Sequence, residues 1–194
     1  KAALLALRQP MESGRTTVAR AAAHITYPSR FQLVAAMNPC RCGYLGDGGR
    51  ECGRAPRCGE DYQNRISGPL LDRVDLTVEV QPATAAELSR APPGEATATV
   101  AARVARARLL QLSRYGEGGP ATNAEADPQS LEQTPDAGAL LEQAAEKLRL
   151  SPRGYSRTLR VARSIADLGG AASIRRQDVA EALAFRHRMP GRRA

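Results

Sequence analysis

Hydrophobic positions recur with two different periods along the chain, and the change of period separates a strand-like first part from a helical second part. Residues 31–37 form a nearly continuous apolar run of strand length, which suits a central strand buried on both faces. Residues 75–80 alternate between apolar and polar, which predicts a second strand. Two shorter β-prone runs, 16–22 and 24–27, predict a hairpin ahead of them.

Helical spacing governs the start of the chain and most of its second half. Residues 1–12 predict the end of an amphipathic helix that Ser13-Gly14 breaks, and 68–73 predict a short helical segment. Ser151-Pro152 has the chemistry of a helix start, with Ser as the N-cap and Pro in the first turn. The spacing of apolar residues predicts four longer helices, over 97–115, 136–148, 152–168 and 175–187.

Together these elements predict a mixed α/β chain in three parts. Residues 1–82 are expected to form a partial α/β core, interrupted by a loop rich in Gly, Arg and Cys at 40–62. Residues 83–130 are expected to be a linker with one helix, followed by a polar stretch with at most one short helical turn. Residues 131–194 are expected to form a C-terminal helical domain.

Composition and charge narrow the classes of partner. The 194 residues carry a formal net charge of +8, and almost all the cations are arginines, since only Lys1 and Lys147 are lysines. An anionic partner such as nucleic acid or a nucleotide fits this charge; arginines solvated on helix faces are the alternative. No run approaches the ~20 apolar residues that cross a bilayer, and the start does not resemble a signal peptide. We therefore expect no membrane partner and a cytoplasmic location, and the missing initial Met indicates a fragment.

Three polar side chains stand where phosphate chemistry is often carried out. Asn38 follows the predicted buried strand, where open α/β sheets place ligands, and its amide can orient a water towards a γ-phosphate. Arg73 precedes the second strand and could reach a neighbouring subunit's phosphates. Arg153 lies in the first turn of a predicted helix, where anions are favoured. The alternatives are a turn Asn before Pro39, an Arg73 salt bridge to Asp72 or Asp75, and a solvated Arg153.

All four cysteines of the chain lie within 19 residues, with the spacing C-x-C-x₉-C-x₅-C. A cytosolic setting argues against disulfides, and four clustered thiols can form one tetrahedral Zn²⁺ site. The spacing differs from the paired C-x₂-C of zinc ribbons, so idle thiols are the alternative. The candidate metal ligands are Cys40, Cys42, Cys52 and Cys58. His24 is expected to be a surface residue.

The segments LVAAMNPCRCGYLGD and YQNRISGPLLDRVDLTVEV resemble the magnesium-chelatase-like AAA+ ATPases, and among them the competence-type ComM/YifB branch. The resemblance extends to LRQPMESGRTTVARAAAHITYPSRF before them and to SPRGYSRTLRVARSIADLGGAASIRRQDVAEAL after them, and it is weak only between about 83 and 130. It implies the C-terminal part of an AAA+ core, with a sensor strand, a hairpin and a following strand, plus an all-α helical lid.

The same resemblance implies roles for individual residues. Asn38 corresponds to the sensor-1 Asn, and Arg153 corresponds to the sensor-2 Arg of the lid. Arg73 corresponds to the arginine finger that acts on a neighbouring subunit, and Arg65 is a weaker candidate for that finger. The implied parent is a hexameric ring motor that hydrolyses ATP with Mg²⁺ and acts on DNA.

The hairpin over 16–27 resembles the hairpin that precedes the sensor strand and points into the ring's pore. Arginines there would contact nucleic-acid phosphates without reading bases. The candidates are Arg15, Arg20 and Arg30.

The chain departs from the family in lacking two motifs. It contains no Gly-x-x-x-x-Gly-Lys-Ser/Thr loop and no apolar run ending in Asp-Glu, so the phosphate cradle and the Mg²⁺-binding acid are missing. We expect a fragment that does not hydrolyse ATP by itself. Two alternatives stay open: a magnesium-chelatase ATPase subunit, against which the cysteine loop counts, and a non-catalytic remnant that serves as an interaction module.

Overall fold

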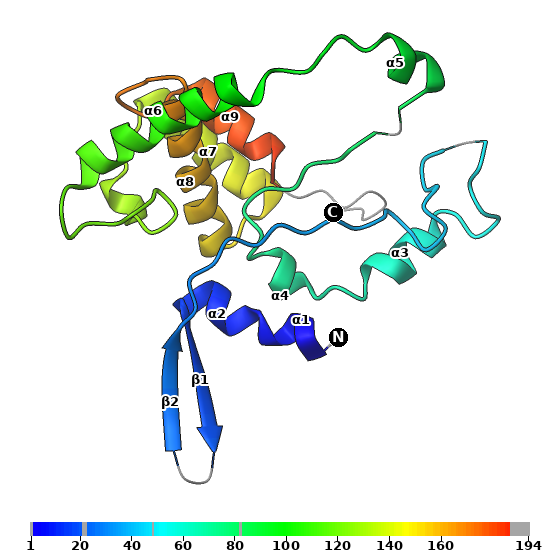
Figure 1. The fold of residues 1–194 in the computed structure, drawn as a ribbon, viewed down its shortest axis with the longest axis horizontal. Helices are drawn as coiled ribbons and strands as arrows, with labels where there is room; N and C mark the ends of the chain where they lie inside the picture. The colour runs from blue at the N-terminus through cyan, green and yellow to red at the C-terminus, as the bar shows by residue number, and fades with distance from the viewer. Residues whose placement is uncertain (1, 21–22, 48, 82, 187–194) are drawn as a thin grey trace. The chain divides into compact units, whose positions relative to one another are not determined.

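The computed structural model describes residues 2–20, 23–47, 49–81 and 83–186 (Figure 1). These residues form two compact units. The first unit comprises the described residues up to Val74, and the second comprises Asp75–Arg186. The described chain mixes helix and strand, as the sequence predicts. None of its helices combines the length and the apolar character that crossing a bilayer requires.

The first unit holds four short helices and a two-stranded hairpin. Gly14 ends the second helix with a φ of 63°, a left-handed conformation that glycine adopts without a steric penalty. The hairpin pairs its strands antiparallel, with Val18 opposite Ile25, and so confirms the hairpin prediction, of which residues 21–22 lie outside the described residues (Figure 1). The elements are α1 (Ala2–Ala6), α2 (Arg8–Ser13), β1 (Arg15–Arg20), β2 (Ala23–Pro28), α3 (Arg57–Gln63) and α4 (Gly68–Leu71).

The two longer strand predictions are wrong for this structure. Residues 31–37 and 75–80 are not in strands, and the apolar side chains along them are exposed, with Val34 at 85% and Val80 at 86%. A strand needs a neighbour that accepts and donates backbone hydrogen bonds along its length, and neither run forms a ladder with a described segment. Within 75–80, the Thr77 N–H donates a single bond of 2.9 Å to the Phe185 carbonyl. The apolar pattern shows what a strand would bury, but it does not supply the partner.

The loop predicted over 40–62 is also partly wrong, because its end, from Arg57 on, is helical. Helix α3 begins at Arg57, directly after Pro56, and continues to Gln63. The Gly and Cys residues in this helix hid it from a composition-based prediction. The short helix α4 confirms the helical segment predicted at 68–73.

The second unit is a helical bundle with its own core. Helices α6, α7 and α8 lie where the periodicity predicts them, and α9 begins as predicted but ends three residues short of His187, which lies outside the described residues. The elements are α5 (Ala85–Arg90), α6 (Thr97–Tyr115), the 3₁₀ turn η1 (Pro128–Ser130), α7 (Pro135–Leu148), α8 (Pro152–Leu168) and α9 (Arg176–Ala184). Their buried apolar side chains are Ala126, Leu131, Ala137, Leu141, Leu159, Ala162, Ile174, Val179 and Ala182.

Alanine is frequent in this core, so the helices can approach closely without large side chains. Helix α8 contacts both α6 and α9, and in Figure 1 it lies among the other long helices.

The three-part division at 82/83 and 130/131 stays a prediction. In the structure, α6 belongs to the same unit as α7, α8 and α9.

A buried ionic network fixes α6 and α8 together. The Asp167 carboxylate, 2% exposed, accepts hydrogen bonds from both Nη atoms of Arg114 at 3.1 and 2.5 Å and from Nδ2 of Asn123 at 2.8 Å. The Asp167 carboxylate also accepts a hydrogen bond at 3.1 Å from Nε of Arg163. The Arg163 side chain is equally buried and donates hydrogen bonds to the carbonyls of Ala171 and Ala172. Burial alone would raise the pKa of Asp167, but these hydrogen bonds and charges lower it below 3.8.

Candidate functional site

Three cysteine sulfurs converge in the first unit. The Sγ atoms of Cys40 and Cys42 are 3.1 Å apart, and together with Sγ of Cys58 they all lie within 4.8 Å of one another. Cys40 and Cys58 are buried, whereas Cys42 is exposed. The cluster joins the segment that follows Asn38 to helix α3 and so closes the loop between them.

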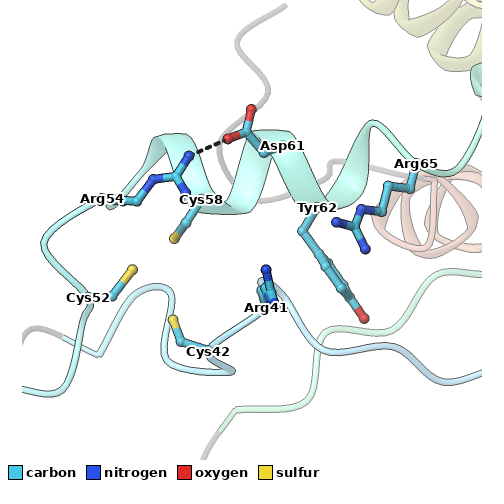
Figure 2. Close-up of a pocket in the computed structure, with 8 residues that line it drawn as sticks. All are labelled: Arg41, Cys42, Cys52, Arg54, Cys58, Asp61, Tyr62 and Arg65. Atoms are coloured by element: carbon cyan, nitrogen blue, oxygen red, sulfur yellow. Dashed lines mark hydrogen bonds and ion pairs between the residues drawn. The ribbon is translucent and has the colours of Figure 1, made fainter.

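The fourth cysteine faces the same space. Cys52 lines a pocket of about 460 Å³ with Cys42 and Cys58, and the three sulfurs point towards its interior (Figure 2). A hydrogen bond with Cys52, followed by burial, raises the pKa of Cys58 to about 12. A hydrogen bond with the Arg54 backbone, followed by those with Cys58 and Cys42, lowers the pKa of Cys52. All four thiols are free in the structure.

Two contacts between loop and helix position these sulfurs. Gly59 leaves room for Leu45, because a Cβ at Gly59 would come within 2.5 Å of a methyl carbon of that side chain. Gln63, 6% exposed, donates from Nε2 to the Pro39 carbonyl at 2.9 Å. The backbone beside Asn38 is therefore tied to α3 through a partly buried hydrogen bond.

The pocket wall is rich in arginine. Arg41, Arg54 and Arg65 line it, with Asp61 and Tyr62 (Figure 2). Arg54 pairs with Asp61 at 3.0 Å, but both side chains are exposed, so this ion pair contributes little stability. The excess of cations makes the pocket suitable for a negatively charged group.

Asn38 and Arg73 both belong to the first unit. Asn38 is exposed and lies two residues before Cys40. Arg73 lies just after α4, is 12% exposed, donates from Nη1 to the Pro69 carbonyl at 2.5 Å, and forms an ion pair with Glu12 on α2. The sequence left open a salt bridge from Arg73 to Asp72 or Asp75, and Asp75 pairs with Arg157. Glu12 was missed because it lies 61 positions away in the chain.

Arg153 belongs to the second unit and is exposed in the first turn of α8. That turn has the predicted cap: the Ser151 hydroxyl accepts a hydrogen bond at 3.0 Å from the Gly154 backbone. The convergence of Arg153 with Asn38 and Arg73 on one nucleotide stays a prediction.

The three hairpin arginines do not form one patch. Arg15 begins β1 opposite Pro28, whereas Arg20 ends it opposite Ala23, so they lie at opposite ends of the strand, ~17 Å apart for five residues of rise. Their odd spacing also places them on opposite faces. Arg30 lies close to Gly14 at the base of the hairpin, which leaves Arg20 nearest the tip. His24 is exposed, as expected.

Comparison with known proteins covers nearly the whole chain. The family model described as "Magnesium chelatase, subunit ChlI" matches residues 1–88, and the one described as "Magnesium chelatase, subunit ChlI C-terminal" matches residues 94–186.

Individual relatives match over most of the chain. It is 42% identical over 183 residues to the competence protein ComM of Haemophilus influenzae, a match that covers 93% of this chain and 35% of that protein. It is 41% identical over 186 residues to the uncharacterised protein YifB of Escherichia coli, with 93% and 36% covered. An uncharacterised protein of Mycobacterium tuberculosis is 43% identical over 188 residues, with 95% and 37% covered.

The chain thus spans a little over a third of the length of the curated relatives it matches. The segments that contain Asn38 and Arg73 fall within the first family model's match, and the segment that contains Arg153 falls within the second. The chain belongs to the magnesium-chelatase-like family.

Proposed function

We propose that this chain forms the C-terminal portion of an ATP-dependent AAA+ ring motor that acts on DNA. The observation that carries the proposal is the 42% identity to a competence protein across 93% of the chain, which includes the segments with all three phosphate-directed residues. The net charge of +8 supports a nucleic-acid partner. The motor would be a cytoplasmic hexamer that uses ATP with Mg²⁺.

Each polar side chain has a separate task in this proposal. Asn38 positions the attacking water and detects the γ-phosphate, and Arg73 neutralises charge in the transition state at a neighbouring subunit's nucleotide. Arg153, on the helical lid, contacts the phosphates of bound ATP. The phosphate loop and the Mg²⁺-binding acid come from another segment of the longer protein.

The exposed apolar runs fit the same proposal. Phe31, Leu33, Val34 and Met37 are all at least 39% exposed, as are Leu76, Val78 and Val80. Contiguous exposed apolar side chains indicate a surface that another segment covers. In the proposed motor, the remainder of the longer protein covers these two runs.

The ion pair between Arg73 and Glu12 gives a sharp test of the finger role. In the full-length protein, Arg73→Ala is expected to lower ATP turnover by ~10³–10⁵-fold while ATP binding is kept. Glu12→Gln removes the ion pair but leaves the guanidinium in place, so it should retain most turnover. Arg65→Ala tests the weaker finger candidate, which lines the cysteine pocket, and should retain most turnover if Arg73 is the finger.

The measurements are steady-state ATPase rates and equilibrium binding of a fluorescent ATP analogue. If Arg73→Ala weakens binding by the same factor as turnover, or if Glu12→Gln is equally inactive, Arg73 is a structural residue and not a finger. A DNA-acting motor is also expected to show ATPase activity stimulated by branched or single-stranded DNA. Failure of both DNA forms to stimulate it would remove the DNA part of the proposal.

A further inference from the structure

We propose that Cys40, Cys42, Cys52 and Cys58 bind one structural Zn²⁺ ion, which holds helix α3 against the segment that carries Asn38. The proposal concerns the fold of the first unit and does not depend on ATP hydrolysis or DNA binding. It rests on the positions of the sulfurs, the composition of the core around them and the charges that line the pocket.

The sulfurs are already close to the spacing of a metal site. Four thiolates at ~2.3 Å from a tetrahedral Zn²⁺ stand ~3.8 Å from one another. Here three sulfurs lie within 4.8 Å of one another, and the nearest pair is 3.1 Å apart. Cys52 points into the same space from the facing side of the loop (Figure 2). Small side-chain movements would therefore complete the tetrahedron.

The type of ligand selects the metal. The four candidate ligands are all soft thiols, whereas Mg²⁺ and Ca²⁺ require oxygen ligands. A closed set of four protein ligands leaves no open position for a water or a substrate, which is the arrangement of structural zinc sites.

The first unit needs such a link because its core is very small. Among its described residues, the buried apolar side chains are Cys40, Cys58 and Leu70. Two of the three are members of the cluster, so the sulfurs occupy the place of a hydrophobic core. Small units with few buried apolar groups are commonly stabilised by a metal or by disulfides, and metal binding then supplies folding free energy.

The pocket also matches the charge of the complex. Four thiolates and one Zn²⁺ carry a net charge of −2, which needs cations or N–H donors nearby. Arg41, Arg54 and Arg65 line the pocket, and Asp61 is paired with Arg54 (Figure 2). The arginines therefore offset the charge that the metal-bound thiolates would carry.

The first experiment measures metal in the purified 194-residue chain. Mass spectrometry of the metal content is expected to give about one zinc per chain, the ratio of a single four-thiolate centre. Replacement with Co²⁺ is expected to give the intense red-region absorption bands of tetrahedral thiolate coordination. Protein that is well folded by circular dichroism yet free of zinc after growth with zinc would overturn the proposal.

Variants identify the ligands. Cys52→Ser is expected to lose most of the zinc and to change the Co²⁺ spectrum, whereas Cys52→His should keep the metal, since imidazole also binds Zn²⁺. Asp61→Asn is the matched control from the same pocket and should bind zinc as the wild type does. If Asp61→Asn loses the metal while Cys52→Ser keeps it, the four-cysteine site is wrong.

Limited proteolysis tests the structural consequence. The loop between the cysteines contains trypsin sites at Arg41, Arg50, Arg54 and Arg57. Removal of zinc by a chelator is expected to speed cleavage there, and re-addition of Zn²⁺, but not of Mg²⁺, should restore protection. Cleavage rates that do not change with zinc would show that the ion does not hold α3. All of these readouts are independent of ATP turnover, so their failure leaves the motor proposal standing.

Discussion

The substitution Asp167→Asn tests how much the buried ionic network stabilises the helical unit. In the wild type each carboxylate oxygen accepts two N–H groups: Oδ1 from Arg114 and Arg163, and Oδ2 from Arg114 and Asn123. An Asn amide keeps the shape but turns one of these oxygens into an NH₂ group. Whichever way the amide is oriented, its NH₂ faces two donors, and the buried Arg163 loses its negative partner.

The expected cost follows from burial. Arg163 is 1% exposed and Asp167 is 2% exposed, so water cannot replace the lost interactions. Removing one partner of a buried ion pair costs about 3–5 kcal/mol, because the other charge stays buried without compensation. For a unit of this size, a loss of that order lowers Tm by about 10–20 °C.

The assay is unfolding of the full chain, by heat and by urea, followed by far-ultraviolet circular dichroism. The control is Glu142→Gln, which removes the same charge from an exposed position on α7 and should change the unfolding free energy by no more than about 0.5 kcal/mol. If Asp167→Asn unfolds within about 1 kcal/mol of that control, the buried network contributes little and the apolar core alone accounts for the stability.

Three further predictions use other parts of the chain. Ser151→Ala removes the cap of α8 and is expected to cost about 1 kcal/mol in the same unfolding assay. The pKa values of Asp167 and Asp178 are lowered below 3.8 in the folded state, so the two carboxylates stabilise the fold fully above that pH. This stabilisation is lost as the pH falls through the lowered pKa values. The urea concentration at the unfolding midpoint should therefore drop below about pH 4, and it should drop less steeply in Asp167→Asn. In the full-length protein, Arg20→Gln at the hairpin tip is expected to weaken DNA binding and reduce the salt slope by about 1, whereas Arg15→Gln at the base should leave the slope unchanged in a filter-binding titration.

The helices could be predicted from sequence because their determinants are local. The Ser151-Pro152 start, the end at Gly169 and the apolar spacing of α8 all lie within one continuous segment. Helix α5 has an equally local signal, since Thr84 and Glu87 form a capping box, but the prolines around it led to the prediction of a linker. That error came from weighing composition above a specific start signal.

The candidate site could be predicted only as far as nearby residues define it. Four cysteines within 19 residues predict a cluster, and the structure brings three sulfurs together with the fourth facing them. The pairing of Arg73 with Glu12 could not be predicted, because two charged residues 61 positions apart carry no shared pattern. Strand predictions at 31–37 and 75–80 failed for a related reason: a strand's stability depends on a neighbour that the run itself does not encode.

The contrast between the two units explains which properties this chain can show by itself. In the second unit, apolar side chains from α7, α8 and α9 bury one another, and the charged groups between α6 and α8 satisfy their hydrogen bonds internally. The first unit buries only Cys40, Cys58 and Leu70 among its described apolar residues and exposes those at 31–37. Because ordering each residue costs ~1–2 kcal/mol of backbone entropy, so small a core must be supplemented by a metal or by a covering sheet. No cysteine lies beyond Cys58, so removal of zinc is expected to loosen the first unit while the helical unfolding transition keeps its midpoint. A midpoint that fell with the metal would show that the helical core depends on the cysteine cluster, and would contradict this division of stability.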